Sequence, residues 1–259
     1  MPCDANGMNL IIIKPAELQG TRAIIGGSRA RHIREVLGSE AGHEIRVGLL
    51  NGPVGRGTIR TLTDACVEIE CVLDGPVPRV PQVSLILALP RPRVMKKLWS
   101  ELSSLGVGHI ILTNANRVER MYFDTHILQP EHYEEWIIDG LQQARDTRTP
   151  PVKICRKLTW VLQDLLPEYF SSHLRLFADP GAPATVRSQI LSAPDAEPHV
   201  VLAVGPEGGW NDHEREAFAA HGFQFIGLGE RTLRTDIACI SLLALAHAAL
   251  EERRARGMG

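Results

Sequence analysis

The sequence predicts a mixed α/β protein in which a small β-barrel is followed by a larger parallel sheet covered by helices. In the first 80 residues, short apolar runs alternate with turn residues, which is typical of small all-β domains. From residue 83 onward, continuous apolar runs alternate with helical patterns, as expected for parallel strands buried on both faces. The stretch DGPVPRVPQ at 74–82 predicts a linker, because proline cannot donate to a strand ladder. We therefore predict two domains, residues 1–76 and residues 77–259.

The N-terminal domain is predicted to contain short strands and one helix. Apolar runs place the strands at 10–14, 44–50 and 66–73. The turn signals between them are rich in glycine and comprise Gly26, Gly27, Asn51, Gly52, Pro53, Gly55 and Gly57. A helix is predicted over residues 28–37, where Ser28 can provide the N-cap. The apolar residues of that helix share one face and are Ile33, Val36 and Leu37.

The C-terminal domain is predicted to alternate strands with helices. The strands are expected at 83–89, 109–113, 174–179, 199–205 and 223–229. The helices are expected at 93–105, 131–145, 211–221 and 235–252. The last residues, EERRARGMG, predict a frayed polar end.

Composition excludes several classes of protein. No apolar run reaches the roughly 18 residues that a transmembrane helix needs, and the N-terminus has no cationic start typical of a signal peptide. The five cysteines form no CxxC pair, so we expect neither a disulfide framework nor a zinc site, and a cytoplasmic location fits. The histidines show no HExxH or HxxxH spacing, and no metal is expected.

The charge of the chain is close to balanced, but its distribution is uneven. The formal net charge is −2, which gives no sign of a nucleic-acid-binding protein. Residues 91–120 nevertheless carry six basic and two acidic side chains. Such a stretch forms either a phosphate-binding face or a solvated surface.

The segment AVGPEGGWNDHEREAF at 203–218 has the pattern of a ligand-binding turn. A strand ends at Gly205, residues 206–209 form a tight turn, and a helix starts at Asn211 or Asp212. Adjacent glycines permit positive φ angles and close approach of a ligand to the backbone, and the helix N-terminus offers free N–H groups. The alternative is a plain strand–helix connection. The turn lacks GxGxxG and the P-loop lysine, which argues against a dinucleotide or nucleoside triphosphate site. Trp210 either lies beside the ligand or packs, and packing is expected.

The segment FIGLGERTLRTDIACISLLALAHAAL at 225–250 repeats this arrangement. A strand runs into glycines, a loop carries Arg231 and Arg234, and Thr235 or Asp236 caps a long helix. That helix is apolar on more than one face, which predicts burial in the core or across an oligomer interface. The two arginines either bind an anionic substrate or pair with surface acids.

Together these two segments resemble the SPOUT-class RNA methyltransferases. The similarity is greatest to the branch that methylates N3 of a uridine in bacterial small-subunit (16S) ribosomal RNA, whose motifs read GPEGG and LGxRxLRTE. Residues 30–52 resemble the PUA-like barrel of that family, residues 88–120 its first strand, helix and second strand, and residues 141–152 its EQxxRxRxP segment.

The resemblance implies an N-terminal PUA-like β-barrel and a C-terminal α/β domain tied in a trefoil knot. It also implies a homodimer whose active site spans the interface and whose knot loops bind S-adenosylmethionine. The residues implied to contact that cofactor are Leu202, Gly205, Pro206, Glu207, Gly208, Gly209, Leu228, Gly229, Arg231, Leu233 and Thr235.

The implied reaction requires loss of the weakly acidic uracil N3 proton. Arg234 matches the arginine of LRTE and is expected to stabilise the resulting charge, while Glu207 and Asp236 are candidates to accept the proton or orient the base. The target nucleotide must leave its stack to be reached. The residues expected to hold RNA of the small ribosomal subunit are Arg29, Arg31, Arg34, Arg91, Arg93, Lys96, Lys97, Arg145 and Arg148.

The sequence also departs from the family pattern at charged positions. The departures are Gly38 for arginine, Glu101 for lysine, Ser104 for glutamate, Gln142 for glutamate, Glu230 for proline and Asp236 for glutamate. They leave two alternatives open. One is an RNA-binding or ribosome-assembly protein with weak or no catalysis, and the other is a methyltransferase acting on another ribosomal RNA nucleotide, such as a ribose 2′-hydroxyl. A small-molecule methyltransferase would leave the N-terminal barrel without a role.

Overall fold

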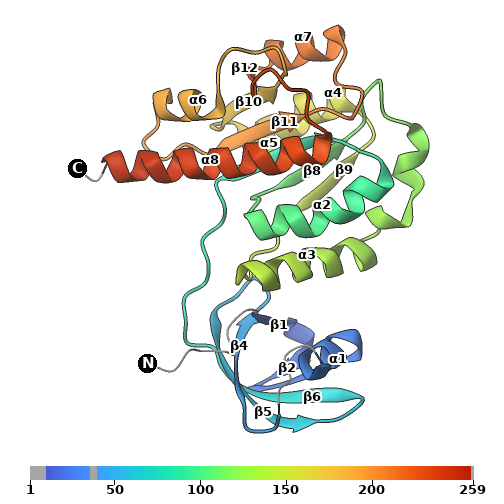
Figure 1. The fold of residues 1–259 in the computed structure, drawn as a ribbon, viewed down its shortest axis with the longest axis vertical. Helices are drawn as coiled ribbons and strands as arrows, with labels where there is room; N and C mark the ends of the chain where they lie inside the picture. The colour runs from blue at the N-terminus through green and yellow to red at the C-terminus, as the bar shows by residue number, and fades with distance from the viewer. Residues whose placement is uncertain (1–9, 36–39, 258–259) are drawn as a thin grey trace. The chain divides into compact units, whose positions relative to one another are not determined.

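The computed structural model describes residues 10–35 and 40–257, which form two compact units (Figure 1). The first unit comprises the described residues up to Val80 together with Ile137–Thr149. The second comprises Pro81–Trp136 and Pro150–Gly259, of which residues up to 257 are described. The helix α3 (Pro130–Ala144) contributes residues to both units.

The first unit is built on a six-stranded sheet with the order β1-β4-β5-β6-β3-β2. Its neighbouring strands are antiparallel except for the parallel pair β1 and β4. The strands are β1 (Ile11–Ile13), β2 (Leu18–Gln19), β3 (Arg22–Gly26), β4 (Glu44–Leu49), β5 (Val54–Leu62) and β6 (Cys66–Val72). Burial alternates along β3, β4 and β6, so each strand turns one row of apolar side chains toward a common core. A 3₁₀ turn (Pro15–Glu17) and the helix α1 (Gly27–Glu35) complete this unit with the end of α3.

The strand β5 corrects the sequence prediction, which placed turns at Gly55 and Gly57. Both glycines lie inside β5, and the strands β2, β3 and β5 were not predicted. A Cβ atom on Gly55 would overlap the carbonyl group of Val72, and one on Gly57 would lie 2.5 Å from the Cγ2 of Ile69. These glycines therefore allow the neighbouring strand to approach closely and do not form turns. The predicted positions Val36 and Leu37, the side chain of Ser28, and Gly38 lie outside the described residues.

The second unit is built on a six-stranded, wholly parallel sheet with the order β12-β10-β11-β7-β8-β9. The strands are β7 (Val83–Ala88), β8 (Ile110–Thr113), β9 (Val152–Cys155), β10 (Leu174–Ala178), β11 (Val200–Val204) and β12 (Gln224–Ile226). Every residue of β7 and β11 is buried, as the continuous apolar runs predicted. β9 was not predicted.

Helices cover this sheet in the way that parallel strands require. Those with predicted counterparts are α2 (Pro92–Leu105), α7 (Asp212–Ala220) and α8 (Thr235–Gly257); α3, which belongs to both units, was also predicted. Those without are two 3₁₀ segments (Arg120–Asp124 and His126–Leu128), α4 (Leu158–Trp160), a π-helical segment (Val161–Leu165), α5 (Leu166–Phe170) and α6 (Val186–Ser192). α8 packs against α2, α6, β7 and β11. Among the described helices, none has the length and apolar character to cross a membrane.

The end of α8 corrects a second prediction. The chain from residue 251 was expected to fray, but the helix continues to Gly257. Arg253 accounts for this. Its guanidinium donates hydrogen bonds at 2.6–3.1 Å to main-chain carbonyls at the end of α6 and just after it. Those carbonyls belong to Ile190, Leu191, Ala193, Asp195 and Ala196. Arg187 of α6 also forms an ion pair with Glu252 at 2.7 Å.

Candidate functional site

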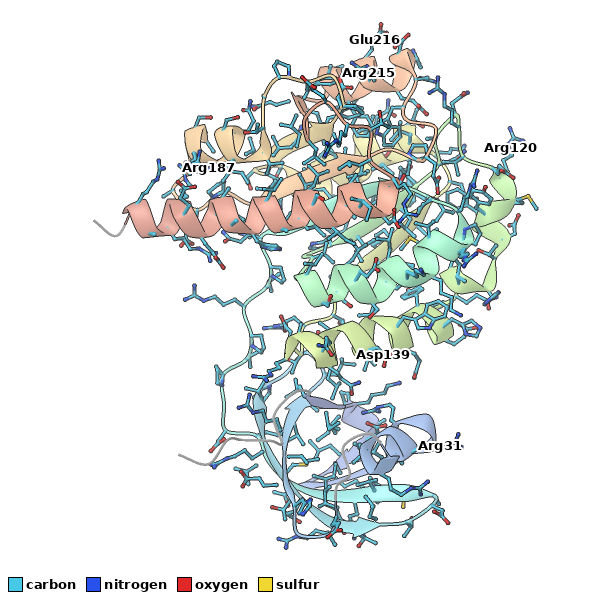
Figure 2. The ribbon with its side chains drawn as sticks, in the orientation of Figure 1. Arg31, Arg120, Asp139, Arg187, Arg215 and Glu216 are labelled. Atoms are coloured by element: carbon cyan, nitrogen blue, oxygen red, sulfur yellow. The ribbon has the colours of Figure 1, made fainter. Side chains whose placement is uncertain are left out.

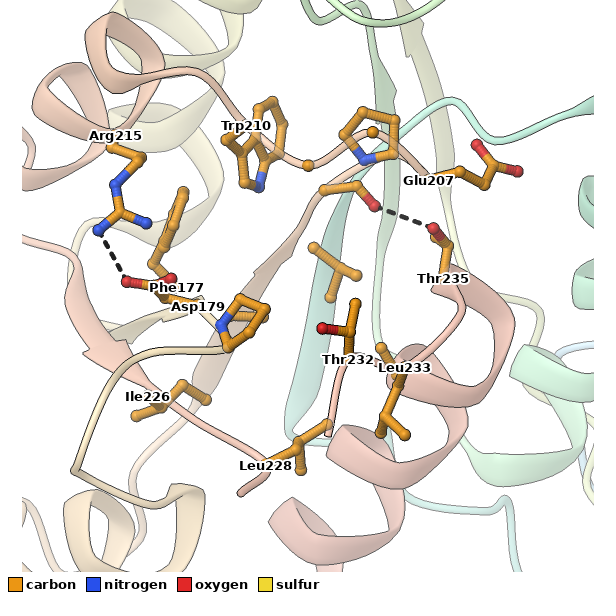
Figure 3. A pocket seen from close by; sticks show the side chains of 18 of the residues that line it. Phe177, Asp179, Glu207, Trp210, Arg215, Ile226, Leu228, Thr232, Leu233 and Thr235 are labelled. Atoms are coloured by element: carbon orange, nitrogen blue, oxygen red, sulfur yellow. Dashed lines mark hydrogen bonds and ion pairs between the residues drawn. The ribbon is translucent and has the colours of Figure 1, made fainter. Parts of the chain in front are cut away.

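A cavity of about 280 Å³ lies beyond the carboxyl ends of β10, β11 and β12 (Figure 3). Because all three strands run in parallel, their following loops meet at one edge of the sheet, where α/β folds bind ligands. The loop after β10, the loop after β11, the loop after β12 and the first turn of α8 surround it. The predicted cofactor contacts among its lining residues are Gly205, Pro206, Glu207, Gly208, Gly209, Leu228, Arg231, Leu233 and Thr235.

Two predicted cofactor contacts lie apart from the cavity lining. Leu202 is buried inside β11, and Gly229 stands in the loop after β12 with a φ of +94°. The left-handed conformation of Gly229 explains why a glycine stands at that bend.

The GPEGG turn is shaped by close packing and main-chain bonds. Gly209 has a φ of +71°, and its N–H donates to the carbonyl oxygen of Pro206 at 2.8 Å. A Cβ atom on Gly205 would lie 3.0 Å from the indole of Trp210, so only glycine fits there without displacing the ring. The hydroxyl of Thr235 donates to the Gly205 carbonyl at 3.3 Å, which joins the turn to the start of α8.

The helix after the turn begins with a complete capping box. The Asn211 side chain accepts from the N–H of Glu214 at 2.8 Å, and the Glu214 carboxylate accepts from the N–H of Asn211 at 2.8 Å. The other Glu214 oxygen accepts from the N–H of Asn116 at 2.7 Å, so this buried carboxylate also ties the turn to the loop after β8. The sequence prediction of a helix starting at Asn211 or Asp212 is confirmed.

Two further contacts hold the GPEGG turn from the neighbouring loops. Arg117, after β8, donates to the carbonyl of Gly208. The Glu207 carboxylate accepts from the N–H of Arg91 at 3.1 Å. The turn is therefore anchored from both sides, while the Glu207 side chain remains exposed beside the cavity.

Trp210 both packs and lines the cavity, so both interpretations that the sequence offered apply. Its ring is 8% exposed and contacts Phe177 and Phe218, with centroids 6.0 and 5.0 Å apart. Its indole N–H is buried and has no hydrogen-bond partner among the described residues. An unpaired buried donor on the wall of a cavity is available to a ligand.

Sequence reasoning missed the contribution of the loop after β10. Asp179 lines the cavity and forms an ion pair with Arg215 of α7 at 2.8 Å (Figure 3). The hydrogen bond from Arg215 holds the pKa of Asp179 below its ordinary value, so the carboxylate stays ionised. No motif in ADPGAP distinguishes this loop from an ordinary turn; only the strand order brings it to the site.

The structure brings two of the three predicted catalytic residues into contact and places the third on the cavity lining. Glu207 lines the cavity, whereas Arg234 and Asp236 flank the lining residue Thr235 without lining the cavity themselves. Arg234 forms an ion pair with Asp236 at 3.1 Å, and its side chain is 77% exposed. An exposed guanidinium beside a cavity remains accessible to a substrate approaching from outside.

A second cavity of about 480 Å³ lies further along the same sheet edge, beside the start of α7. Its polar lining includes Asn114, Arg120, Arg156, Lys157 and His213. The side-chain oxygen of Asn114 is buried there without a partner among the described residues. Arg156 and Lys157 were missed because β9, which precedes them, was not predicted.

The predicted RNA-binding residues of the first unit have different environments. Arg29 is held internally by Glu17 at 2.6 Å and by the carbonyl of Ile12, with a side chain only 14% exposed. Arg34 forms an ion pair with Asp64 at 2.7 Å, and Arg148 donates to the Pro78 carbonyl at 3.0 Å. The exposed residues are Arg31 (Figure 2) and Arg145.

In the second unit, the predicted RNA-binding residues lie at the start of α2. Arg91, Arg93, Lys96 and Lys97 are all exposed. The ammonium group of Lys96 lies 5.3 Å from the ring centre of Trp136. Among the described residues, no group of three or more histidine, cysteine, aspartate or glutamate side chains is arranged to hold a metal ion.

A parallel sheet with a ligand-sized cavity beyond its carboxyl edge defines an α/β protein of the ligand-binding kind. The chain belongs to the RNA methyltransferase family, whose domain matches residues 78–247. It is 30% identical over 255 residues to ribosomal RNA small subunit methyltransferase E of Treponema pallidum, covering 93% of this chain and 92% of that protein. Ribosomal RNA small subunit methyltransferase E 1 of Borreliella burgdorferi is 25% identical over 234 residues, covering 90% of this chain and 95% of that protein. The predicted resemblance to RNA methyltransferases is confirmed.

Solved structures share the fold. Ribosomal RNA small subunit methyltransferase E from Neisseria gonorrhoeae, bound to S-adenosyl methionine, superposes with a TM-score of 0.74 at 21% identity, covering 93% of this chain and 98% of that one. A probable rRNA-methyltransferase from Porphyromonas gingivalis gives a TM-score of 0.75 at 21% identity, covering 95% and 100%. The mixed α/β architecture with two sheets is therefore the one these proteins have.

Proposed function

We propose that this protein transfers a methyl group from S-adenosylmethionine to N3 of a uridine in 16S ribosomal RNA. The observation that carries the proposal is the cavity formed by the GPEGG turn and the segment 228–235, which brings both family motifs to one site. The names of the two relatives above support the ribosomal RNA substrate. The cofactor named with the Neisseria structure supports the methyl donor.

The residues of the cavity suit that cofactor. Phe177, Ile226, Leu228 and Leu233 offer apolar walls, and residues 205–209 expose main chain without bulky side chains. Asp179 and Glu207 add carboxylates to the lining, and Arg215 and Arg231 add guanidinium groups, which suits a cofactor that carries both a cationic sulfonium and a carboxylate. When bound, S-adenosylmethionine supplies an activated methyl group on that sulfonium.

The chain's own residues provide the remaining chemistry. Arg234, exposed beside the cavity, is placed to stabilise negative charge on the uracil carbonyl oxygens after N3 loses its proton. Glu207 is a candidate acceptor for that proton, and Asp236 orients the Arg234 guanidinium through their ion pair.

We extend the proposal to the finer architecture. The first sheet is a PUA-like barrel and the second unit a trefoil-knotted SPOUT domain, with domains at 1–76 and 77–259. The parallel order β12-β10-β11-β7 and the return of α8 onto β7 and β11 support this arrangement. Exposed apolar residues of α8, including Ile237 and Leu245, support a homodimer.

Cofactor binding is tested by calorimetric titration with S-adenosylmethionine. Gly208→Trp should abolish binding, because the new ring must occupy the turn that Arg117 contacts. Gly181→Trp is the matched control, since no atom lies within 4 Å of a Cβ atom at Gly181. Equal binding by both variants would place the cofactor elsewhere.

Catalysis is tested with small ribosomal subunits that lack the modification, followed by mass analysis of the nucleosides. Arg234→Ala should lower methyl transfer by about 100-fold or more while cofactor affinity is retained. Arg187→Ala, outside the cavity, is the control. A methyl group found on a ribose or on another base would show that the target is not N3 of a uridine. Cofactor and RNA binding without any transfer would favour the assembly-protein alternative.

A further inference from the structure

The first unit contains a basic cavity that the reaction site does not include. It has a volume of about 360 Å³ and lies over β4 and β5, which are adjacent in Figure 1. Its lining residues are Leu10, Arg46, Val54, Gly55, Arg56, Asp74 and Arg145. Three guanidinium groups face one carboxylate, so the cavity favours an anion.

Arg46 and Arg56 stand directly opposite each other across the antiparallel strands. Their flanking residues Ile45, Val47 and Gly57 are buried, which places both arginines on the outer face of the sheet. Like charges at directly opposed positions destabilise a strand pair. Neither guanidinium has a hydrogen bond or ion pair to any residue in 10–35 or 40–257. Folding alone therefore gives no reason for this pair.

Arg145 adds a conformational observation to the electrostatic one. It follows the last residue of α3 and has a φ of +59°, in the left-handed region. A non-glycine residue is strained in this conformation, and glycine or asparagine is usual after a helix. The chain instead places a third arginine at the lining of this cavity.

We propose that Arg46, Arg56 and Arg145 bind a backbone phosphate of the substrate RNA, with Asp74 beside them accepting a ribose 2′-hydroxyl. Guanidinium groups bind phosphate oxygens in a bidentate manner, and a phosphate between Arg46 and Arg56 removes their mutual repulsion. The 2′-hydroxyl is the donor that distinguishes RNA from DNA. The assignment rests on the proposed function, because it takes RNA as the substrate.

Filter binding of protein-free 16S ribosomal RNA, over a series of salt concentrations, tests the site. The double variant Arg46→Gln with Arg56→Gln should bind at least tenfold more weakly at low salt. Its slope of log K against log salt should fall by about 1.4, for two lost contacts to single-stranded RNA. The thermal midpoint should stay the same or rise, because the like-charge pair is gone. Arg60→Gln is the control, being an exposed arginine of β5 outside the cavity.

The carboxylate is tested separately with a labelled uridine oligonucleotide and its deoxy counterpart. Asp74→Ala should reduce the preference for RNA over DNA. An unchanged preference would remove Asp74 from the site.

Three results would overturn the arginine site. They are unchanged binding by the double variant, an equal loss in Arg60→Gln, and competition by polyglutamate as effective as that by RNA. These binding measurements do not depend on methyl transfer. If the wild type binds 16S RNA but never methylates it, and the double variant loses that binding, the site is supported while the proposed function is rejected.

Discussion

At the scale of single residues, Gly205 shows how one missing side chain shapes the cavity. The Trp210 indole lies where a Cβ atom would intrude, and that ring is held between Phe177 and Phe218. Because Phe177 and Phe218 flank this ring, a side chain at position 205 must displace it and so alter the cavity wall.

Gly205→Ala should therefore weaken S-adenosylmethionine binding by about tenfold and destabilise the fold by about 1–3 kcal/mol, the usual cost of overpacking. Calorimetric titration and thermal unfolding measure the two effects. Gly181→Ala, in open space, should change neither. Wild-type affinity in Gly205→Ala would show that Trp210 does not form part of the binding surface.

The candidate site was predictable only where its residues are contiguous. The GPEGG turn and the segment 228–235 carry adjacent glycines and arginines, which the sequence displays directly. Asp179 and Phe177 come from a loop without a motif, and only the neighbouring positions of β10 and β11 bring them to the cavity. The unpaired indole N–H of Trp210 was not predictable, because the sequence cannot show that this group lacks a hydrogen-bond partner.

At the scale of elements, the wrong predictions concern two glycines inside the strand β5 and the charged C-terminal end of α8. Gly55 and Gly57 resemble turn residues in sequence, but in β5 they make room for Val72 and Ile69 of the next strand. The strand pairing that requires this room is a non-local property. By contrast, β7 and β11 were predictable, because burial on both faces leaves a continuous apolar run.

The end of α8 gives a prediction at this scale. Arg253→Met should lower the free energy of unfolding by about 2 kcal/mol, because the carbonyls of the last turn of α6 and of the residue after it lose a charged donor. Chemical denaturation measures this change. Arg256→Met should stay within about 0.5 kcal/mol, since within residues 10–35 and 40–257 Arg256 pairs only with Glu252, at the surface. Equal effects in both variants would show that the end of α8 is not anchored through Arg253.

At the scale of the whole molecule, the amino-terminal edge of the parallel sheet carries a cluster of histidines. His109 and His173 both contact Phe170, and the rings of His173 and His199 are 5.2 Å apart. Burial, together with the neighbouring His199, His109 and Arg175, lowers the pKa of His173 to about 4. Burial also lowers the pKa of His109.

These shifts make stability depend on pH in a definite direction. A depressed pKa means that the folded state disfavours the protonated ring, so the full stability is present above the ordinary pKa of 6.5 and is lost as pH falls toward 4. The thermal midpoint should decrease steadily between pH 7 and pH 4.5 in scanning calorimetry. His173→Phe should flatten that decrease, whereas His132→Gln, an exposed change on α3, should leave it intact. A decrease of equal slope in both variants would assign the acid sensitivity to other groups.

The proposed dimer also belongs to this scale. Ile237 and Leu245 are 40% and 45% exposed on a helix whose opposite side is fully buried. Leu245→Glu should convert a dimer to a monomer in light scattering, because the carboxylate would lose its hydration in an apolar interface. Ala219→Glu, an exposed change on α7, is the control. A wild-type monomer at micromolar concentration would reject the dimer.

The indole of Trp210 gives this protein an optical reporter of its own cavity. Of the four tryptophans, Trp160 is 48% exposed and Trp99 is fully buried, whereas Trp210 lines the cavity itself. A molecule that enters the cavity changes the surroundings of this ring, and the change in emission should disappear in Trp210→Phe. Entry and departure of a ligand can then be timed by fluorescence in the unmodified protein, without a label and without waiting for a methyl group to be transferred.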